Sequence, residues 1–118
     1  MPELKKYKMF VDGEWVDSES KKTFETLNPE NNEPWAVAPE ASAKDVDRAV
    51  KAAQKAFEGE WPKLLPRDRA KFLRAIADQL RKNAEMLGEI ETIDTGKLFR
   101  ETKQQATYIA EYYDYMQD

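Results

Sequence analysis

The side chains that could do chemistry here are carboxylates, lysines, arginines and tyrosines, because the 118 residues include no cysteine and no histidine. They can therefore build neither a thiolate nucleophile nor an imidazole base, nor a metal site made from either group. Three carboxylates, Glu89, Glu91 and Asp94, lie close together before a predicted helix end. Oxygen ligands of this kind suit Na⁺, K⁺, Mg²⁺ or Ca²⁺. The alternative is a solvated face on which Lys97 pairs with one of them.

Aromatic residues form a second candidate site near the end of the chain. Tyr108, Tyr112 and Tyr115 follow one another at spacings of four and three, so a helix would place them on one face. Such a face could line an aromatic pocket for a ligand, although tyrosine stripes more commonly belong to a core or an interface.

Nucleotide-binding turns are not indicated. The four glycines stand at positions 13, 59, 88 and 96, too far apart for a Gly-x-Gly-x-x-Gly turn or a Walker loop. Gly96 and Lys97 are followed by a leucine, and we interpret Gly96 as a helix stop.

Charge and hydropathy narrow the classes of partner. The net charge is −4, and the only basic cluster, Lys5, Lys6 and Lys8, is interpreted as a solvated tail, so we expect no nucleic-acid partner. No apolar run approaches the length of a transmembrane helix, and the first residues do not resemble a signal peptide. We therefore expect no membrane partner and a cytoplasmic location, which the absence of cysteine weakly favours.

The first 40 residues read as two β-hairpins. Residues 8–11 and 14–16 form the first around Asp12-Gly13, a dipeptide suited to a tight turn. Residues 23–27 and 34–38 form the second around Asn31-Asn32. Because Pro34 and Pro39 flank the last strand, we expect it at a sheet edge.

From residue 42 the periodicity becomes helical. Ser42 and Asp45 resemble a capping box. Pro66 suits a helix start, Asn83 a break and Gly96 a stop. A last helix, at about 98–116, is apolar over much of its girth and needs partners on two sides. The apolar face of the first helix is predicted to comprise Val46, Ala49, Val50, Ala53 and Phe57.

These elements predict an α+β fold, with N-terminal β-hairpins followed by about four helices. We interpret residues 1–118 as an incomplete single domain, with hairpins over 1–40 and helices over 42–118.

The order of these signals resembles the first part of the NAD(P)-dependent aldehyde dehydrogenase superfamily, and within it the betaine aldehyde dehydrogenases. The first hairpin, residues 9–16, is similar to the first hairpin of that family, and residues 23–29 to its second strand and turn. The helix that includes residues 45–50, the tryptophan at 61 and the helix over 67–80 follow in the same order. Residues 91–97 match a Glu-Thr-x-Asp-Thr-Gly-Lys segment of the family, and residues 111–113 its aromatic pair.

The resemblance implies the outer portion of a cofactor domain, in an enzyme that oxidises an aldehyde to a carboxylic acid. In that family a cysteine thiolate forms a thiohemiacetal, hydride passes to NAD or NADP, and a glutamate activates water. Those residues and the cofactor loop lie later in the family's sequence. No catalytic or cofactor-binding residue can therefore be assigned here, and we expect the chain alone to be inactive and to bind no cofactor.

The resemblance also implies two weaker sites. A structural K⁺ or Na⁺ would be held by Asp94 and by chain oxygens at Thr26 and Leu27. Gln105, Tyr108 and Tyr112 would lie near the aldehyde entrance. The implied partners are the remainder of the enzyme or another subunit, in a homo-oligomer. The alternative function is a non-catalytic interaction module that uses the tyrosine-rich last helix.

Overall fold

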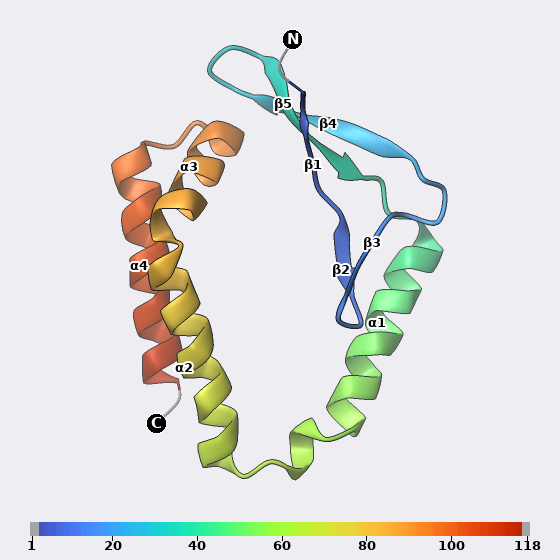
Figure 1. Ribbon diagram of the computed structural model, residues 1–118, viewed down its shortest axis with the longest axis vertical. Helices are drawn as coiled ribbons and strands as arrows, with labels where there is room; N and C mark the ends of the chain where they lie inside the picture. The colour runs from blue at the N-terminus through green and yellow to red at the C-terminus, as the bar shows by residue number, and fades with distance from the viewer. Residues whose placement is uncertain (1–2, 117–118) are drawn as a thin grey trace. The chain divides into compact units, whose positions relative to one another are not determined.

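The computed structural model describes residues 3–116, which fall into two compact units divided after Pro62 (Figure 1). The first unit contains strands β1 (Lys5–Lys6), β2 (Met9–Val11), β3 (Glu14–Val16), β4 (Thr23–Asn28) and β5 (Glu33–Pro39), and helix α1 (Ala43–Glu58). A short 3₁₀ turn, η1 (Trp61–Lys63), spans the division. The second unit contains α2 (Pro66–Lys82), α3 (Ala84–Thr95) and α4 (Phe99–Tyr115). The predicted α+β class is confirmed.

Strands β2 and β3 form the predicted first hairpin. They pair antiparallel, with Met9 opposite Val16 and Val11 opposite Glu14. The turn between them holds Asp12 at φ 53° and Gly13 at φ 81°. Positive φ at both central residues matches the right-handed twist of the strands, and it explains why an Asp-Gly dipeptide stands there.

The second sheet has the strand order β1-β5-β4, so the prediction that β5 lies at an edge is wrong. β5 pairs antiparallel with β4 and parallel with β1. Within residues 3–116, the β5 residues in register with β1 are Ala36 and Val37. Pro34 and Pro39 lie outside that short pairing, so their missing N–H groups remove no hydrogen bond between β5 and β1.

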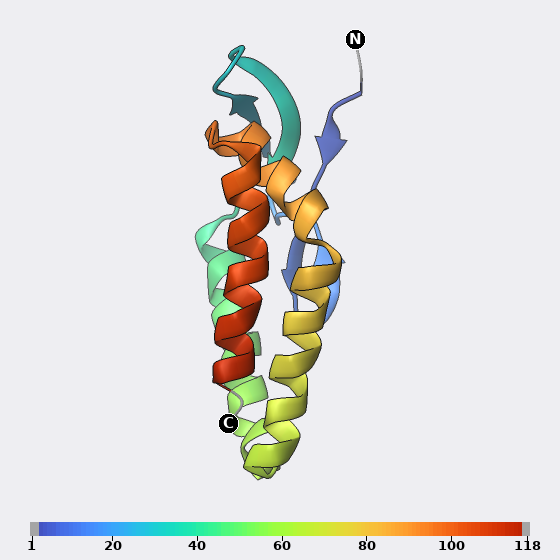
Figure 2. The same cartoon turned by 90° about the vertical axis from the view of Figure 1, so that its left-hand side faces the viewer.

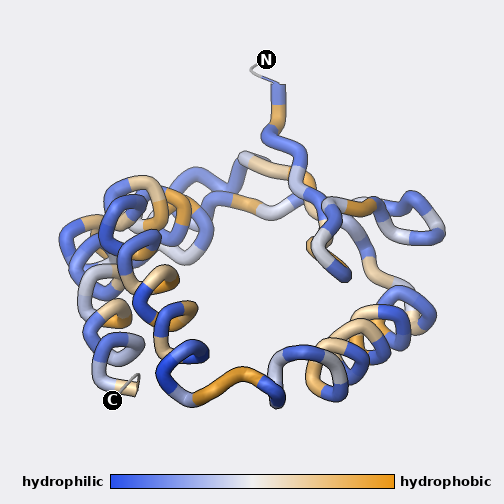
Figure 3. Tube along the Cα trace, turned by 60° about the horizontal axis from the view of Figure 1, so that its bottom comes forward, coloured by the Kyte–Doolittle hydropathy of each residue, from blue (hydrophilic) through white to orange (hydrophobic). Residues whose placement is uncertain are grey.

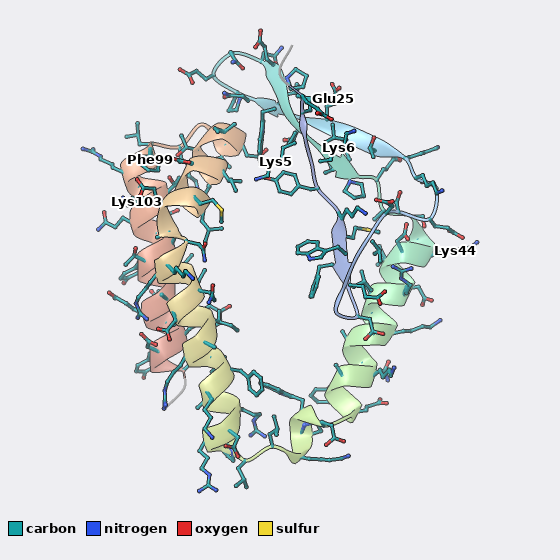
Figure 4. All side chains as sticks on the ribbon, in the orientation of Figure 1. Lys5, Lys6, Glu25, Lys44, Phe99 and Lys103 are labelled. Atoms are coloured by element: carbon teal, nitrogen blue, oxygen red, sulfur yellow. The ribbon has the colours of Figure 1, made fainter. Side chains whose placement is uncertain are left out.

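Strand β1 also corrects the interpretation of the N-terminal lysines as a tail. Lys5 and Lys6 lie opposite Ala36 and Val37, and their side chains remain exposed (Figure 4). The Nζ atom of Lys5 lies 4.9 Å from the centroid of the Tyr7 ring. Lysine on a short outer strand is a common way to discourage further strand pairing.

One buried carboxylate starts α1. Asp45 accepts hydrogen bonds from the Ser42 backbone N–H and hydroxyl, both at 2.9 Å, and the Ser42 hydroxyl accepts from the Asp45 N–H, so the predicted capping box is confirmed. Both Asp45 oxygens also accept from the backbone N–H of Glu19, at 3.1 and 3.2 Å. The backbone hydrogen bond from Ser42 is the main cause that lowers the pKa of Asp45. Lys44, which pairs with Glu19 at 2.9 Å, reinforces this junction (Figure 4).

The predicted apolar face of α1 is present but largely uncovered. Apolar residues recur along the helix (Figure 3), yet Val46, Val50 and Phe57 are 55%, 59% and 71% exposed. Ala49 and Ala52 are less exposed, and Ala52 lines a cavity together with Val11 of β2.

The expected break at Asn83 divides α2 from α3, but its side chain does not cap α3. The Asn83 Nδ2 group instead donates to the Gln79 carbonyl oxygen at 2.8 Å, in the last turn of α2. Pro66 begins α2 and Gly96, at φ 75°, ends α3, both as predicted.

A close crossing joins α3 to α4. A Cβ atom on Gly88 would lie 2.8 Å from the Lys103 backbone nitrogen and 2.9 Å from its Cα atom. At the same place Thr102, which is fully buried, donates from its hydroxyl to the Gly88 carbonyl oxygen at 2.9 Å. The hydroxyls of Thr102 and Thr92 are also 2.9 Å apart. Only glycine at position 88 lets the two backbones approach this closely.

Small residues also form the contact between α2 and α4, which run side by side (Figure 2). The buried apolar residues of this unit are alanines, at positions 70, 77, 84, 106 and 110. Arg81 of α2 forms an ion pair with Asp114 of α4 and lies 3.6 Å from Asp78. The hydrogen bond from Arg81 to Asp114 is the main cause that raises the pKa of Arg81.

We expect Gly88→Ala to destabilise the second unit. The added methyl group meets backbone atoms of α4, which cannot rotate away, so the overpacking cost of about 1–3 kcal/mol outweighs alanine's better helix propensity. Urea unfolding followed by circular dichroism measures the change. Glu89→Ala, at an exposed neighbouring position of α3, is the matched control and should change stability little. Equal stability of the two variants would contradict the close crossing.

The Asp45→Asn variant should lower the thermal stability of the first unit at neutral pH. Because folding lowers the pKa of this carboxyl group, its contribution is present above the ordinary pKa of aspartic acid and is lost as the pH falls through the lowered value. The difference in melting temperature between wild type and variant should therefore shrink towards acidic pH. A difference that stays constant from pH 7 to pH 2 would argue against this role.

Candidate functional site

Aromatic and charged side chains lie together along the outer side of α4. We call it the tyrosine face. Its residues line two adjoining depressions of ≈ 350 and ≈ 310 Å³ that share Tyr108. The lining residues are Glu101, Gln104, Gln105, Tyr108, Glu111, Tyr112 and Tyr115. All belong to α4, so the fold of one helix sets their mutual positions.

Two tyrosines stand at right angles at the centre of this face. The ring centroids of Tyr108 and Tyr112 are 5.3 Å apart, with an interplanar angle of 90°. The interaction with the Tyr112 hydroxyl is the main cause that raises the pKa of Tyr108, and burial and Glu111 add to it. Tyr108, Tyr112 and Tyr115 are nevertheless 56%, 54% and 75% exposed, so their rings are available to a ligand.

The charge of the tyrosine face is negative. Glu101 and Glu111 contribute carboxylates, and none of the lining residues is a lysine or an arginine. Two basic residues near this face have acidic partners outside it. Arg81 pairs with Asp114, and Lys103 lies 3.5 Å from Glu85 and 5.9 Å from the centre of the Phe99 ring (Figure 4).

The residues predicted for the substrate entrance, Gln105, Tyr108 and Tyr112, all lie on this face. Their role at an entrance stays a prediction. Sequence reasoning missed Glu101, Gln104 and Glu111, although a signal was present. With Tyr108 and Tyr115, they recur at alternating spacings of three and four, which is the period of one helical face.

One carboxylate of the acidic cluster at the end of α3 has a basic partner. Glu91 pairs with Lys97 at 2.6 Å, as the solvated-face alternative expected. Within residues 3–116, no three acidic side chains come together in a way that could hold a metal ion.

The residues predicted to hold K⁺ or Na⁺ lie in different units. Thr26 and Leu27 belong to β4, where the register with β5 shifts between these two residues. Asp94 lies in α3 and is exposed. This cation set stays a prediction.

Two further cavities lie elsewhere among the described residues. An apolar groove of ≈ 530 Å³ along α2 and α3 contains no charged side chain; it is lined by Phe72, Ala75, Ile76, Gln79, Leu80, Asn83, Met86 and Leu87. A cavity of ≈ 380 Å³ between the first hairpin and α1 mixes cations with carboxylates, and its Lys51 already pairs with Asp47 at 2.6 Å. Among the described residues, no helix is both long and apolar enough to cross a bilayer.

Known proteins resemble this chain over nearly its whole length. The family model described as "Aldehyde dehydrogenase family" matches residues 15–118. An aldehyde dehydrogenase from Aspergillus niger is 48% identical over 89 residues, which are 75% of this chain and 18% of that protein. The chain spans about a fifth of the length of the relatives it matches.

Solved structures agree with the sequence match. An NAD-dependent aldehyde dehydrogenase from Sinorhizobium meliloti superposes with a TM-score of 0.92 at 34% identity, covering 97% of this chain and 23% of that one. A betaine aldehyde dehydrogenase from Staphylococcus aureus, solved in complex with NAD⁺, gives a TM-score of 0.89 at 38% identity, covering 93% and 22%. On this agreement of sequence, fold and length of match, the chain belongs to the aldehyde dehydrogenase family.

Proposed function

We propose that this chain is the N-terminal portion of an NAD(P)⁺-dependent aldehyde dehydrogenase, an enzyme that oxidises an aldehyde to a carboxylic acid. The observation that carries the proposal is the family match over residues 15–118. The chain spans about a fifth of the length of its relatives, which is why we propose a portion of the enzyme. The chain supplies scaffold to such an enzyme, because the nucleophilic cysteine that the family's chemistry needs is not among its residues.

The residues present do not fit a dinucleotide site, since each glycine serves another purpose. Gly13 forms the hairpin turn and Gly59 follows the last residue of α1. Gly88 allows the crossing with α4, and Gly96 ends α3. A pyrophosphate needs several backbone N–H groups in a glycine-rich turn before a helix. We therefore propose that other parts of the enzyme hold NAD(P) and that this chain alone turns over no aldehyde.

Within this proposal the tyrosine face contributes to the approach of the substrate, through Gln105, Tyr108 and Tyr112. Their support is their common position on an exposed surface that offers hydrogen-bonding groups and aromatic rings. A K⁺ or Na⁺ at Thr26, Leu27 and Asp94, and assembly into a homo-oligomer, remain expectations that follow from the family resemblance.

One observation favours the alternative function, a non-catalytic interaction module. Tyr108, Tyr112 and Tyr115 are all more than half exposed, and exposed tyrosines are enriched where proteins bind one another. This alternative requires no further part of an enzyme.

A chimaera distinguishes the two functions. Residues 1–118 replace the corresponding segment of an aldehyde dehydrogenase relative that is stable and active when purified. NADH formation is then followed at 340 nm with an aldehyde that the parent enzyme accepts. We expect NADH formation within about tenfold of the parent, because the chain should fold as the segment it replaces. The chain alone should give no NADH under the same conditions.

The parent enzyme lacking the segment is the negative control, and a chimaera carrying Gly88→Ala should lose activity in proportion to its loss of fold. A chimaera that is folded and oligomeric like its parent, yet inactive, would count against the enzyme and for the interaction module.

A further inference from the structure

We propose that the cavity between the first hairpin and α1 binds a free α-amino acid with an aliphatic side chain. The hairpin and α1 lie side by side (Figure 1), and the cavity is lined by cations of α1, carboxylates of the hairpin and aliphatic side chains of both. All lining residues belong to the first unit. The proposal therefore rests on that unit alone and not on the function proposed for the enzyme.

The alternation of side chains along β2 and β3 gives the hairpin two faces. Successive residues of a strand point to opposite faces, and Val11 lies opposite Glu14 in the register. Val11, Glu14 and Val16 therefore share one face, and all three line the cavity. Phe10 and Trp15, whose ring centroids are 5.0 Å apart, belong to the other face. The face that lines the cavity thus combines two aliphatic side chains with a carboxylate.

Helical spacing gathers the cations on the other side of the cavity. Arg48, Lys51 and Lys55 recur along α1 at intervals of three and four, so they share one face of the helix with Ala52. Lys51 already pairs with Asp47 at 2.6 Å. A ligand carboxylate is therefore held by Arg48 and Lys55, and the guanidinium group can bind it with two parallel hydrogen bonds.

The charges of the two sides select a ligand that carries both signs. Asp12 and Glu14 on the hairpin side repel a phosphate or a dicarboxylate, and the cations of α1 repel an amine or a metal ion. An amino acid satisfies both sides, because its carboxylate meets the cations and its ammonium group meets the two hairpin carboxylates. Within residues 3–116, no three acidic side chains are grouped so that they could hold a metal ion instead.

The volume and the aliphatic lining limit the size of the ligand. At ≈ 380 Å³ the cavity is near the lower end of the range for small-molecule sites, about 300–1,000 Å³. Val11, Val16 and Ala52 are only half-buried, so an aliphatic side chain placed against them removes further apolar surface from water. A branched amino acid of the size of valine therefore matches the cavity in charge, size and hydropathy.

A titration of the intact 118-residue chain with L-valine tests the proposal without turnover. The valine methyl groups of the protein are labelled with ¹³C, and their NMR shifts are followed as unlabelled L-valine is added. We expect saturable shifts at Val11 and Val16, with a dissociation constant on the order of 10 mM for a ligand of this size. Val46 and Val50 lie on the exposed apolar face of α1, outside the cavity, and serve as internal references.

Two analogues separate the contributions of the two ligand charges. The anion 3-methylbutanoate lacks the ammonium group of L-valine, and the cation isobutylammonium lacks its carboxylate. At constant ionic strength, each should bind at least about threefold more weakly than L-valine, because each loses one favourable charge contact and keeps the repulsion from the side that it cannot pair with. Equal affinity for L-valine and either analogue contradicts the two-sided site.

Two substitutions connect binding to the two sides of the cavity. Arg48→Gln should weaken L-valine binding about two- to fivefold, as expected for an exposed charge contact. Arg100→Gln makes the same charge change at an exposed position of α4 and should leave the affinity unchanged. Glu14→Gln should reduce the preference for L-valine over 3-methylbutanoate, since the ammonium group loses a partner. A purely structural effect of this substitution would weaken both ligands equally.

Each opposite outcome overturns the proposal. These are the absence of saturable shifts at Val11 and Val16, equal shifts at Val46 and Val50, and unchanged affinity in an Arg48→Gln variant whose valine spectrum shows the native fold. If Arg48→Gln does not fold, the ligand preference of Glu14→Gln decides the outcome.

Discussion

The second unit depends on how closely α3 and α4 approach at Gly88 and Thr102. A methyl group at position 88 would come within 2.8 Å of the backbone of α4, so the contact leaves no room for a side chain. The Thr102 hydroxyl, fully buried, has partners on both helices. The other buried apolar residues here are alanines, which keep the helices close but bury little area each. The contacts at Gly88 and Thr102 therefore fix which side of α4 faces α3. The tyrosine face lies on the opposite side of the helix as a consequence.

Features of the fold that arise within a few residues could be predicted from the sequence. The Asp12-Gly13 turn, the Ser42–Asp45 capping box and the Gly96 stop each involve local backbone geometry that the residue types at those positions favour. Contacts between distant residues could not be predicted. Nothing local indicates that Lys5 and Lys6 pair with β5, and the two prolines of β5 suggested an edge because the shortness of β1 was unknown. Gly88 likewise gave no sign of the helix that crosses it.

In the candidate site, too, local features could be predicted and contacts between distant residues could not. The spacing of Tyr108, Tyr112 and Tyr115 placed them correctly on one face, because helical periodicity is a local property. The glutamates of that face were missed, since an exposed carboxylate on a helix usually indicates nothing more than contact with water. Whether these glutamates leave a net negative charge on the face depends on which acidic residues the nearby basic residues pair with. The pairs of Arg81 with Asp114 and of Lys103 with Glu85 form only in the folded unit.

Asp45 joins parts of the chain that would otherwise order separately. Its carboxylate receives the N–H of Glu19, 26 residues earlier, as well as the groups that begin α1. The whole β4–β5 hairpin lies between Glu19 and Asp45. The Asp45 carboxylate is therefore the acceptor both for the hydrogen bond that closes this long loop and for those that begin the helix. Loop closure of this length has an entropic cost that a single hydrogen bond does not offset, but a shared carboxylate makes the two events favour each other. The hairpin loop and the start of α1 are therefore expected to open and close together, as one cooperative segment.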